Sequence, residues 1–142
     1  MATTTAAVTL TSDLLSDALS VSTTTTCMKA GTTADGLDQM DTGYIEIATG
    51  DVYDILDATV LGLDKANKVY ICNESTDETY YVDITVKAEV IGSLYAGDWM
   101  FIPWGAEDAT ADIEIQGATG TNTICYALFH EGQTLHAGGD TV

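Results

Sequence analysis

The sequence is poor in basic residues. It has four lysines and no arginine among its 142 residues, against 22 acidic residues, so its formal net charge at pH 7 is -18. A chain with this charge repels a phosphate backbone, which argues against nucleic-acid binding. The charge does not predict disorder, because 46% of the residues are hydrophobic and a disordered chain carries fewer. We expect a folded protein that does not bind nucleic acid.

Long hydrophobic runs are also missing. No stretch approaches the roughly 18 consecutive apolar residues that a membrane-spanning helix needs. Residues 1–20 contain neither a basic residue nor an unbroken apolar segment, so they do not resemble a secretory signal. The sequence therefore predicts no membrane partner.

Residues that supply catalytic or metal chemistry are scarce. His130 and His136 are the two histidines, and no GxSxG motif accompanies them, so we expect a partly exposed His130 at a strand end and no enzyme activity. Cys27, Cys72 and Cys125 lack CxxC and zinc-ligand spacing. We expect buried free thiols, and one disulfide with a leftover thiol remains open. No cofactor is predicted.

Two acidic segments raise the question of calcium. Aspartates recur at three-residue spacing in residues 35–41 and again in residues 51–57. An EF-hand loop needs ligands at alternating positions, a glycine at the sixth and a glutamate at the twelfth, and neither segment meets this pattern. We expect solvated acidic loops and predict no metal site, although weak divalent-ion binding remains open.

Threonine is abundant, with 23 residues, and its branched side chain favours strands. Glycine, aspartate and asparagine separate runs rich in β-branched and aromatic residues, a pattern typical of antiparallel meanders. These runs are KVYICN, ETYYVDITVKAEVIG, GDWMFIPW, ADIEIQG and TNTICYALFHE. We expect an all-β fold over residues 1–142, a single-domain antiparallel β-sandwich. Residues 51–63 have no clear period and remain open between a bent strand and a single helical turn.

The two ends of the chain are expected to differ from the centre. Residues 1–12 alternate apolar and threonine side chains, so they predict an extended N-terminal arm that pairs with a neighbouring chain, with Val8 and Leu10 as interface residues. A hairpin with the alternating segment around Leu19 is the alternative. Residues 131–142 are expected to form a flexible or partner-dependent tail.

The segment YAGDWMFIPWG has an apolar side chain on both faces if it forms a strand. Pro103, the single proline, cannot donate to a strand ladder and places the segment at a sheet edge or a bulge. We expect Trp99 and Phe101 in the core. Trp104 and Tyr95 are then the candidates for contact with another subunit.

The strand runs also resemble a known group of proteins. In order, NKVYICNES, YYVDITV, IGSLYAGDWMFIPWG, DIEIQGA and TICYALFHEG are similar to runs in small virion proteins of tailed bacteriophages, especially phages of marine cyanobacteria. The opening TLTSDLLSDALSVSTTTTCMKAGTT resembles the start of the same group. The resemblance implies a structural role in a virion.

On this basis we expect a capsid decoration or cement protein with a jelly-roll-like sandwich. It would sit on the capsid exterior after assembly in the host cytoplasm, with the major capsid protein as partner and a dimer or trimer as its own oligomer. A tail or baseplate component is one alternative. A carbohydrate-binding module, in which Trp99 or Trp104 stacks on sugar rings, is another.

Overall fold

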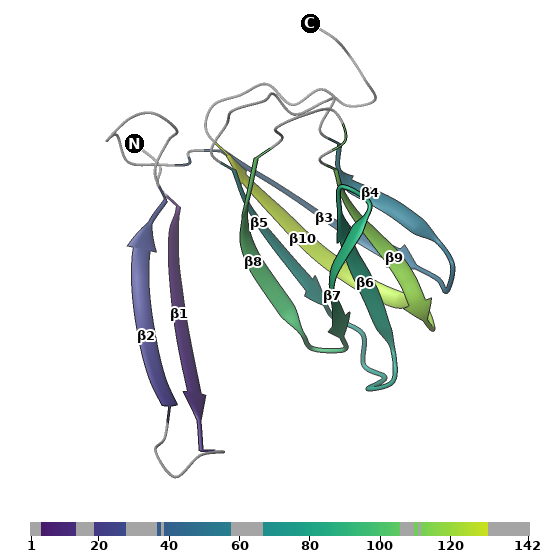
Figure 1. The fold of residues 1–142 in the computed structure, drawn as a ribbon, viewed down its shortest axis with the longest axis horizontal. Helices are drawn as coiled ribbons and strands as arrows, with labels where there is room; N and C mark the ends of the chain where they lie inside the picture. The colour runs from purple at the N-terminus through teal and green to yellow at the C-terminus, as the bar shows by residue number, and fades with distance from the viewer. Residues whose placement is uncertain are drawn as a thin grey trace, which may run out of the picture.

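The computed structural model describes residues 4–13, 19–27, 37, 39–57, 67–105, 110 and 112–130. These residues form ten β-strands in three sheets, all of whose neighbouring strands are antiparallel, and the described part contains no helix (Figure 1). The predicted all-β antiparallel class is confirmed. Residues 58–63 and 131–142, whose structure the sequence left open or expected to be loose, lie outside the described residues.

Eight strands form two four-stranded sheets. The first sheet has the order β3-β10-β5-β8 and consists of β3 (Gln39–Ile47), β10 (Asn122–His130), β5 (Asn67–Asn73) and β8 (Trp99–Trp104). The second sheet has the order β4-β9-β6-β7 and consists of β4 (Val52–Leu56), β9 (Ile113–Thr119), β6 (Tyr81–Val86) and β7 (Glu89–Tyr95). Pro103 lies in β8, which is an edge strand, as its missing N–H group predicts.

The strand pairs of the two sheets are nested. β3 pairs with β10, β4 with β9, β5 with β8 and β6 with β7. Strands β3 to β10 are thus arranged like one long antiparallel hairpin that is folded over itself, and its tip is the turn between β6 and β7. The two central residues of that turn, Lys87 and Ala88, have φ values of 56° and 61°. Positive φ at both central residues is the geometry of a type I′ turn.

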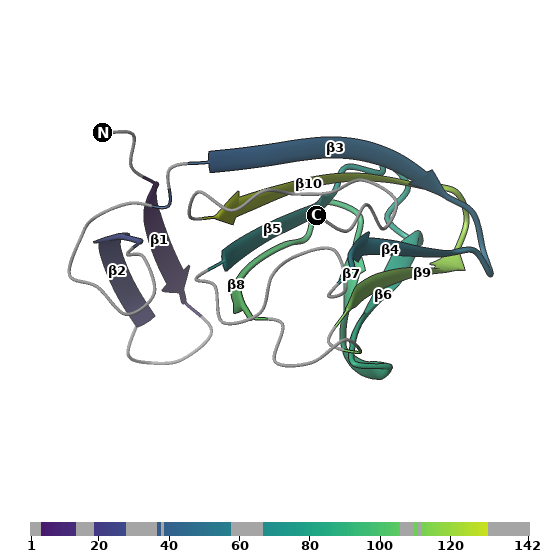
Figure 2. The ribbon, with the colours of Figure 1, turned by 90° about the horizontal axis from the view of Figure 1, so that it is seen from above.

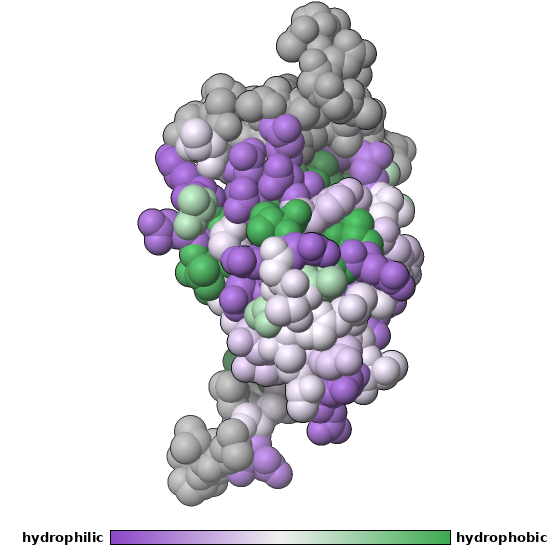
Figure 3. Space-filling model, turned by 90° about the vertical axis from the view of Figure 1, so that its right-hand side faces the viewer, coloured by the Kyte–Doolittle hydropathy of each residue, from purple (hydrophilic) through white to green (hydrophobic). Residues whose placement is uncertain are grey.

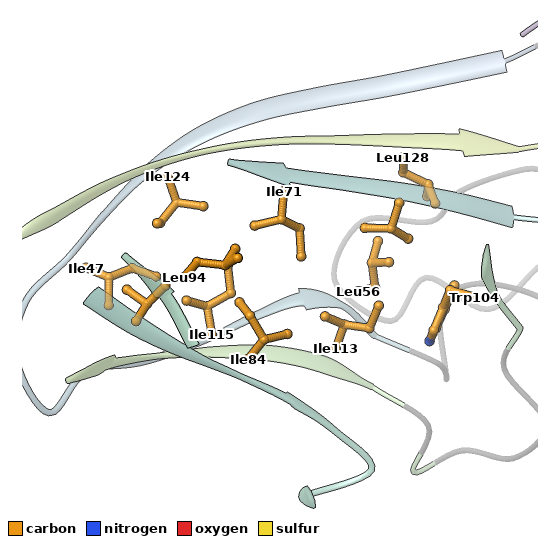
Figure 4. Close-up of a cluster of buried hydrophobic side chains, with 12 residues drawn as sticks. Ile47, Leu56, Ile71, Ile84, Leu94, Trp104, Ile113, Ile115, Ile124 and Leu128 are labelled. Carbon is orange, nitrogen blue, oxygen red and sulfur yellow. The ribbon is translucent and has the colours of Figure 1, made fainter. Parts of the chain in front are cut away.

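The core lies between the two sheets. All eight strands contribute buried side chains to it, and Figure 4 shows them meeting in the space between the sheets. The buried cluster consists of Ile47, Leu56, Val69, Ile71, Val82, Ile84, Leu94, Trp104, Ile113, Ile115, Ile124 and Leu128. Truncation of such a residue to alanine costs about 2 to 5 kcal/mol of stability, so the core accounts for the cohesion of the sandwich.

Two buried asparagines connect the sheets at one end. Asn73 of the first sheet donates to the Leu94 carbonyl at 3.0 Å and to Asn122 Oδ1 at 2.9 Å. Asn122, also of the first sheet, donates to the carbonyls of Tyr81 and Thr119 in the second sheet. Because these amides are fully buried, their hydrogen bonds with the second sheet fix how the two sheets align.

The first two strands form a separate hairpin. β1 (Thr5–Ser12) pairs with β2 (Leu19–Thr26) over its whole length, and the hairpin stands beside the sandwich in Figures 1 and 2. At its base, the Cys27 amide donates to the Thr4 carbonyl and the Thr4 hydroxyl donates to the Leu37 carbonyl, both at 2.9 Å. The segment expected to be an extended arm is therefore paired with its own chain, which is the hairpin alternative.

Candidate functional site

The outward side of the first sheet is apolar and aromatic. The core residues of its strands alternate with outward-facing ones, and the strand register places Tyr44, Cys125, Cys72 and Trp99 in one row across all four strands. Neighbouring rows on the same side add the remaining residues. We call this surface the aromatic face, formed by Met40, Tyr44, Lys68, Tyr70, Cys72, Trp99, Phe101, Pro103, Cys125 and Phe129.

Rings on the aromatic face pack against one another. The ring centroids of Tyr70 and Trp99 are 6.4 Å apart at an interplanar angle of 32°, and those of Phe101 and Phe129 are 6.3 Å apart in an edge-to-face arrangement. Both distances fall within the favourable range for aromatic pairs. Even so, Tyr44 is 68% exposed and Trp99 51% exposed. The face is preorganised by its own contacts and still leaves large apolar groups accessible.

The outward side of the second sheet is mixed, with carboxylates among exposed apolar side chains such as Val52, Val90 and Tyr95. There, Asp54, Glu114 and Thr85 lie side by side on neighbouring strands, and the Thr85 hydroxyl donates to Glu114 Oε2 at 3.0 Å. Partial burial, with the nearby charge of Glu114, raises the pKa of Asp54 above its ordinary value. Asp83 accepts a hydrogen bond from the Ser93 hydroxyl in the same surface. We call this surface the acidic face.

The two faces give the sandwich a polarity. An antiparallel sheet commonly has one wet face, and the acidic face fits that rule. The aromatic face departs from that rule, because it leaves several large apolar side chains exposed. Exposed apolar surfaces of this kind usually mark contact sites. Figure 3 views the molecule from the side of β4, where hydrophilic residues surround separate small hydrophobic patches. The aromatic face is the candidate functional site.

Two tyrosines of the aromatic face interact with two cysteines. A hydrogen bond with Cys72, together with partial burial, raises the pKa of Tyr70 to about 12. A hydrogen bond with Cys125 likewise raises the pKa of Tyr44 above its ordinary value. Sequence spacing gave no sign of this cluster, because its members come from three strands.

The predicted interface residues lie in three different places. Val8 and Leu10 are on the hairpin, where Leu10 is exposed opposite Val21. Tyr95 is exposed at one end of the acidic face, and its ring stacks on that of Tyr81 at 4.8 Å. Trp104 is in the core. The structure therefore does not bring the four predicted residues together.

The expected positions of the two tryptophans were wrong. Trp104 is 5% exposed and belongs to the core cluster, whereas Trp99 is exposed on the aromatic face. The predicted alternation along β8 is present, but its phase is reversed. Trp99 pairs with Cys72 and Trp104 with Asn67, and β5 buries Asn67 while Cys72 faces outward. The neighbouring strand thus decides which tryptophan is inside.

His130 also differs from expectation. It was predicted to be partly exposed, yet it is 1% exposed, with Nε2 2.9 Å from Asp41 Oδ2. Asp41 lies in β3 opposite Leu128 of β10, so the pair links two neighbouring strands. The interaction explains how a polar ring is accommodated at the end of the core, because a buried polar group needs a hydrogen-bond partner.

All three cysteines are free thiols; Cys27 is buried as predicted, but Cys72 and Cys125 are only half-buried. Within the described ranges, no group of three or more histidine, cysteine, aspartate or glutamate residues is placed to hold a metal ion. The same part of the chain has no helix long and apolar enough to cross a membrane.

Comparison with known proteins gives no further assignment. The chain matches no protein-family model and no curated protein.

Proposed function

We propose that the protein is a structural component of a bacteriophage virion that decorates or cements the outer surface of the capsid. The aromatic face carries this proposal, because it offers a preorganised apolar surface for a protein partner. The partner is the major capsid protein, and the protein acts as a homo-oligomer, a dimer or a trimer. The acidic face then points toward solvent.

We further propose that the sandwich is a jelly roll. Counting β3 as the first strand and β10 as the eighth, the two sheets have the orders 1-8-3-6 and 2-7-4-5. This nested order, with the first strand paired to the eighth, is typical of jelly rolls, which include viral capsid domains. A fold does not by itself define a function, so the strand order supports the virion role without carrying it.

The charge of the chain fits an apolar attachment. With 22 acidic residues and four lysines, the protein repels copies of itself wherever carboxylates would meet. Among the residues that define the aromatic face Lys68 is the one charged residue, and the exposed Glu46 lies at its edge, two positions beyond Tyr44 on the same side of β3. Apolar contact at this surface is therefore the mode of attachment that involves the least like-charge repulsion.

The test is the composition and structure of phage particles whose genome encodes this chain. We expect the protein in many copies per capsid, seated on the shell, with the aromatic face toward the capsomers in a cryo-EM reconstruction. A few copies confined to the tail would favour the tail or baseplate alternative. Complete absence from purified particles would overturn the virion proposal.

A carbohydrate-binding module is the second candidate. The observation that favours it is the exposed Trp99 beside the tilted ring of Tyr70, since exposed aromatic rings have an apolar surface on which a sugar ring can stack. A glycan array distinguishes the two candidates. Binding that is lost in Trp99→Ala and retained in Tyr95→Ala would support the carbohydrate function, and an array without any binder would eliminate it.

A further inference from the structure

Two cysteines of the aromatic face lie directly opposite each other. Cys72 of β5 and Cys125 of β10 are register partners in the two central strands of the first sheet. Both are half-buried free thiols, and both side chains point outward in the row that also holds Tyr44 and Trp99. They are separated by 53 positions in sequence and are brought together by strand pairing alone.

The geometry of the pair suits a covalent bond. Directly opposed residues of antiparallel strands have Cα atoms about 4.5 or 5.5 Å apart, depending on the hydrogen-bonding class of the pair. Disulfides span Cα separations of about 4.4 to 6.8 Å, so both classes fall within the allowed range. The ladder already fixes the two backbones. Forming the bond therefore requires side-chain rotation and a small approach of the two strands, without rearrangement of the fold.

We propose that Cys72 and Cys125 form a redox modification site, a cross-strand dithiol that is converted reversibly to an intramolecular disulfide. The oxidant is a small disulfide of the glutathione class. The thiolate of one cysteine attacks a sulfur of the oxidant, forms a mixed disulfide and releases one small thiolate. The second cysteine then attacks the protein sulfur of that mixed disulfide and releases the second thiolate. The protein loses two protons and two electrons, and the oxidant becomes two thiols.

The surroundings make the site specific and reversible. The hydroxyls of Tyr44 and Tyr70 approach the two sulfurs, one each: Tyr44 reaches Cys125 from the neighbouring strand β3, and Tyr70 reaches Cys72 from two positions along β5. Partial exposure leaves the sulfurs accessible to small thiols and disulfides. Cys27, by contrast, is buried at the base of the hairpin and lies outside this row.

The test is oxidation of the full chain with oxidised glutathione, followed by thiol counting in denaturant and intact-mass measurement. We expect the thiol count to fall from three to one and the mass to fall by two hydrogen atoms. Trypsin cleaves after lysine, so the linked peptides are residues 69–87 and 88–142. Dithiothreitol should restore all three thiols.

Cysteine variants provide the controls. Cys27→Ser should still lose two thiols on oxidation, whereas Cys72→Ser and Cys125→Ser should each retain a stable glutathione adduct at the remaining partner. Both serine variants change a half-buried position, and an unchanged melting curve verifies their fold. Persistence of three thiols in the wild type, accumulation of mixed disulfides on it, or disulfide-linked dimers in place of the internal bond would overturn the proposal.

Discussion

At the scale of single residues, two tryptophans that are five positions apart occupy different environments. Trp104 fills one end of the core, as Figure 4 shows, and Trp99 lies on the aromatic face next to Tyr70. The same residue type thus has a stability role at one position and an accessible surface at the other. Mutation of each residue separates the two roles.

We expect Trp104→Ala to lower the free energy of unfolding by about 3 to 5 kcal/mol, because it leaves a cavity in the core. Trp99→Ala should change it by much less, since half of that side chain is already exposed. Urea unfolding measures both. On the virion proposal, Trp99→Ala also weakens binding to capsids, and Tyr95→Ala, on the other sheet and similarly exposed, is the matched control. Equal loss of stability in both tryptophan variants would contradict this assignment.

Tyr70 gives a prediction about pH. Its pKa is raised to about 12 by the hydrogen bond with Cys72 and by partial burial, from an ordinary value of 10.0. Folding therefore favours the protonated phenol. The resulting stabilisation is fully present below pH 10 and is lost as the pH rises from about 10 to about 12.

The measurement is an alkaline titration of tyrosine absorbance, with Tyr70→Phe to identify the signal of this residue. We expect one late-titrating tyrosine in the wild type that disappears in the variant. In Cys72→Ala the titration of Tyr70 should move down toward its ordinary range, because the hydrogen-bonding sulfur is gone. A wild type in which Tyr70 titrates at its ordinary pKa would contradict the hydrogen bond.

At the scale of strands and turns, residue alternation predicted which segments form strands better than it predicted where the strands end. The runs around KVYICN, GDWMFIPW and TNTICYALFHE became β5, β8 and β10. The run ETYYVDITVKAEVIG was expected as one segment, with EVIGSLYAGDW as a candidate for one more short strand; it contains β6 and the start of β7, joined at Lys87 and Ala88. Neither lysine nor alanine is a common turn residue at positive φ, so composition carried no signal for the tip of the folded hairpin.

At that turn the residue types do not favour the backbone conformation that they adopt. Left-handed backbone costs a non-glycine residue roughly 1 to 2 kcal/mol, and both Lys87 and Ala88 adopt it. Replacing the pair by Asn-Gly, the preferred type I′ sequence, should raise the free energy of unfolding by about 1 kcal/mol. Chemical denaturation tests this. Val-Val at the same positions is the control and should destabilise, because β-branched side chains tolerate positive φ poorly; a neutral result for both pairs would argue against the turn.

The site was less predictable than the fold. Its cysteines and aromatic residues lie on four strands, and only the register of β3, β10, β5 and β8 places them in rows. Alternation within β8 correctly indicated two apolar sides, but which side faces the core depends on pairing with β5. Long-range register is a property of the folded sheet. A single sequence shows only the local alternation of residues along each strand. It could not predict which residues of different strands share the aromatic face.

At the scale of the whole molecule, the two outer faces of the sandwich differ in polarity while the chain carries a large negative charge. The acidic face contributes carboxylates such as Asp54, Asp83 and Glu114, and the aromatic face contributes rings and two thiols. On the virion proposal, a protein built in this way would associate in one orientation. Charge would keep most of its surface apart from like-charged neighbours, and apolar burial would hold the aromatic face against the capsid.

This division predicts how attachment responds to salt. If the protein binds the capsid through the aromatic face, the attraction is apolar and the principal electrostatic effect is repulsion among carboxylates. Salt reduces such repulsion, because it screens exposed charges beyond about 10 Å at 0.1 M. We therefore expect the fraction of protein bound to purified capsids to stay constant or rise as sodium chloride is added, measured by co-sedimentation. Sodium sulfate, which strengthens apolar burial, should raise it further. Release by moderate salt would show instead that a basic patch on the partner holds the protein through its acidic face, and the orientation proposed for the sandwich would be reversed.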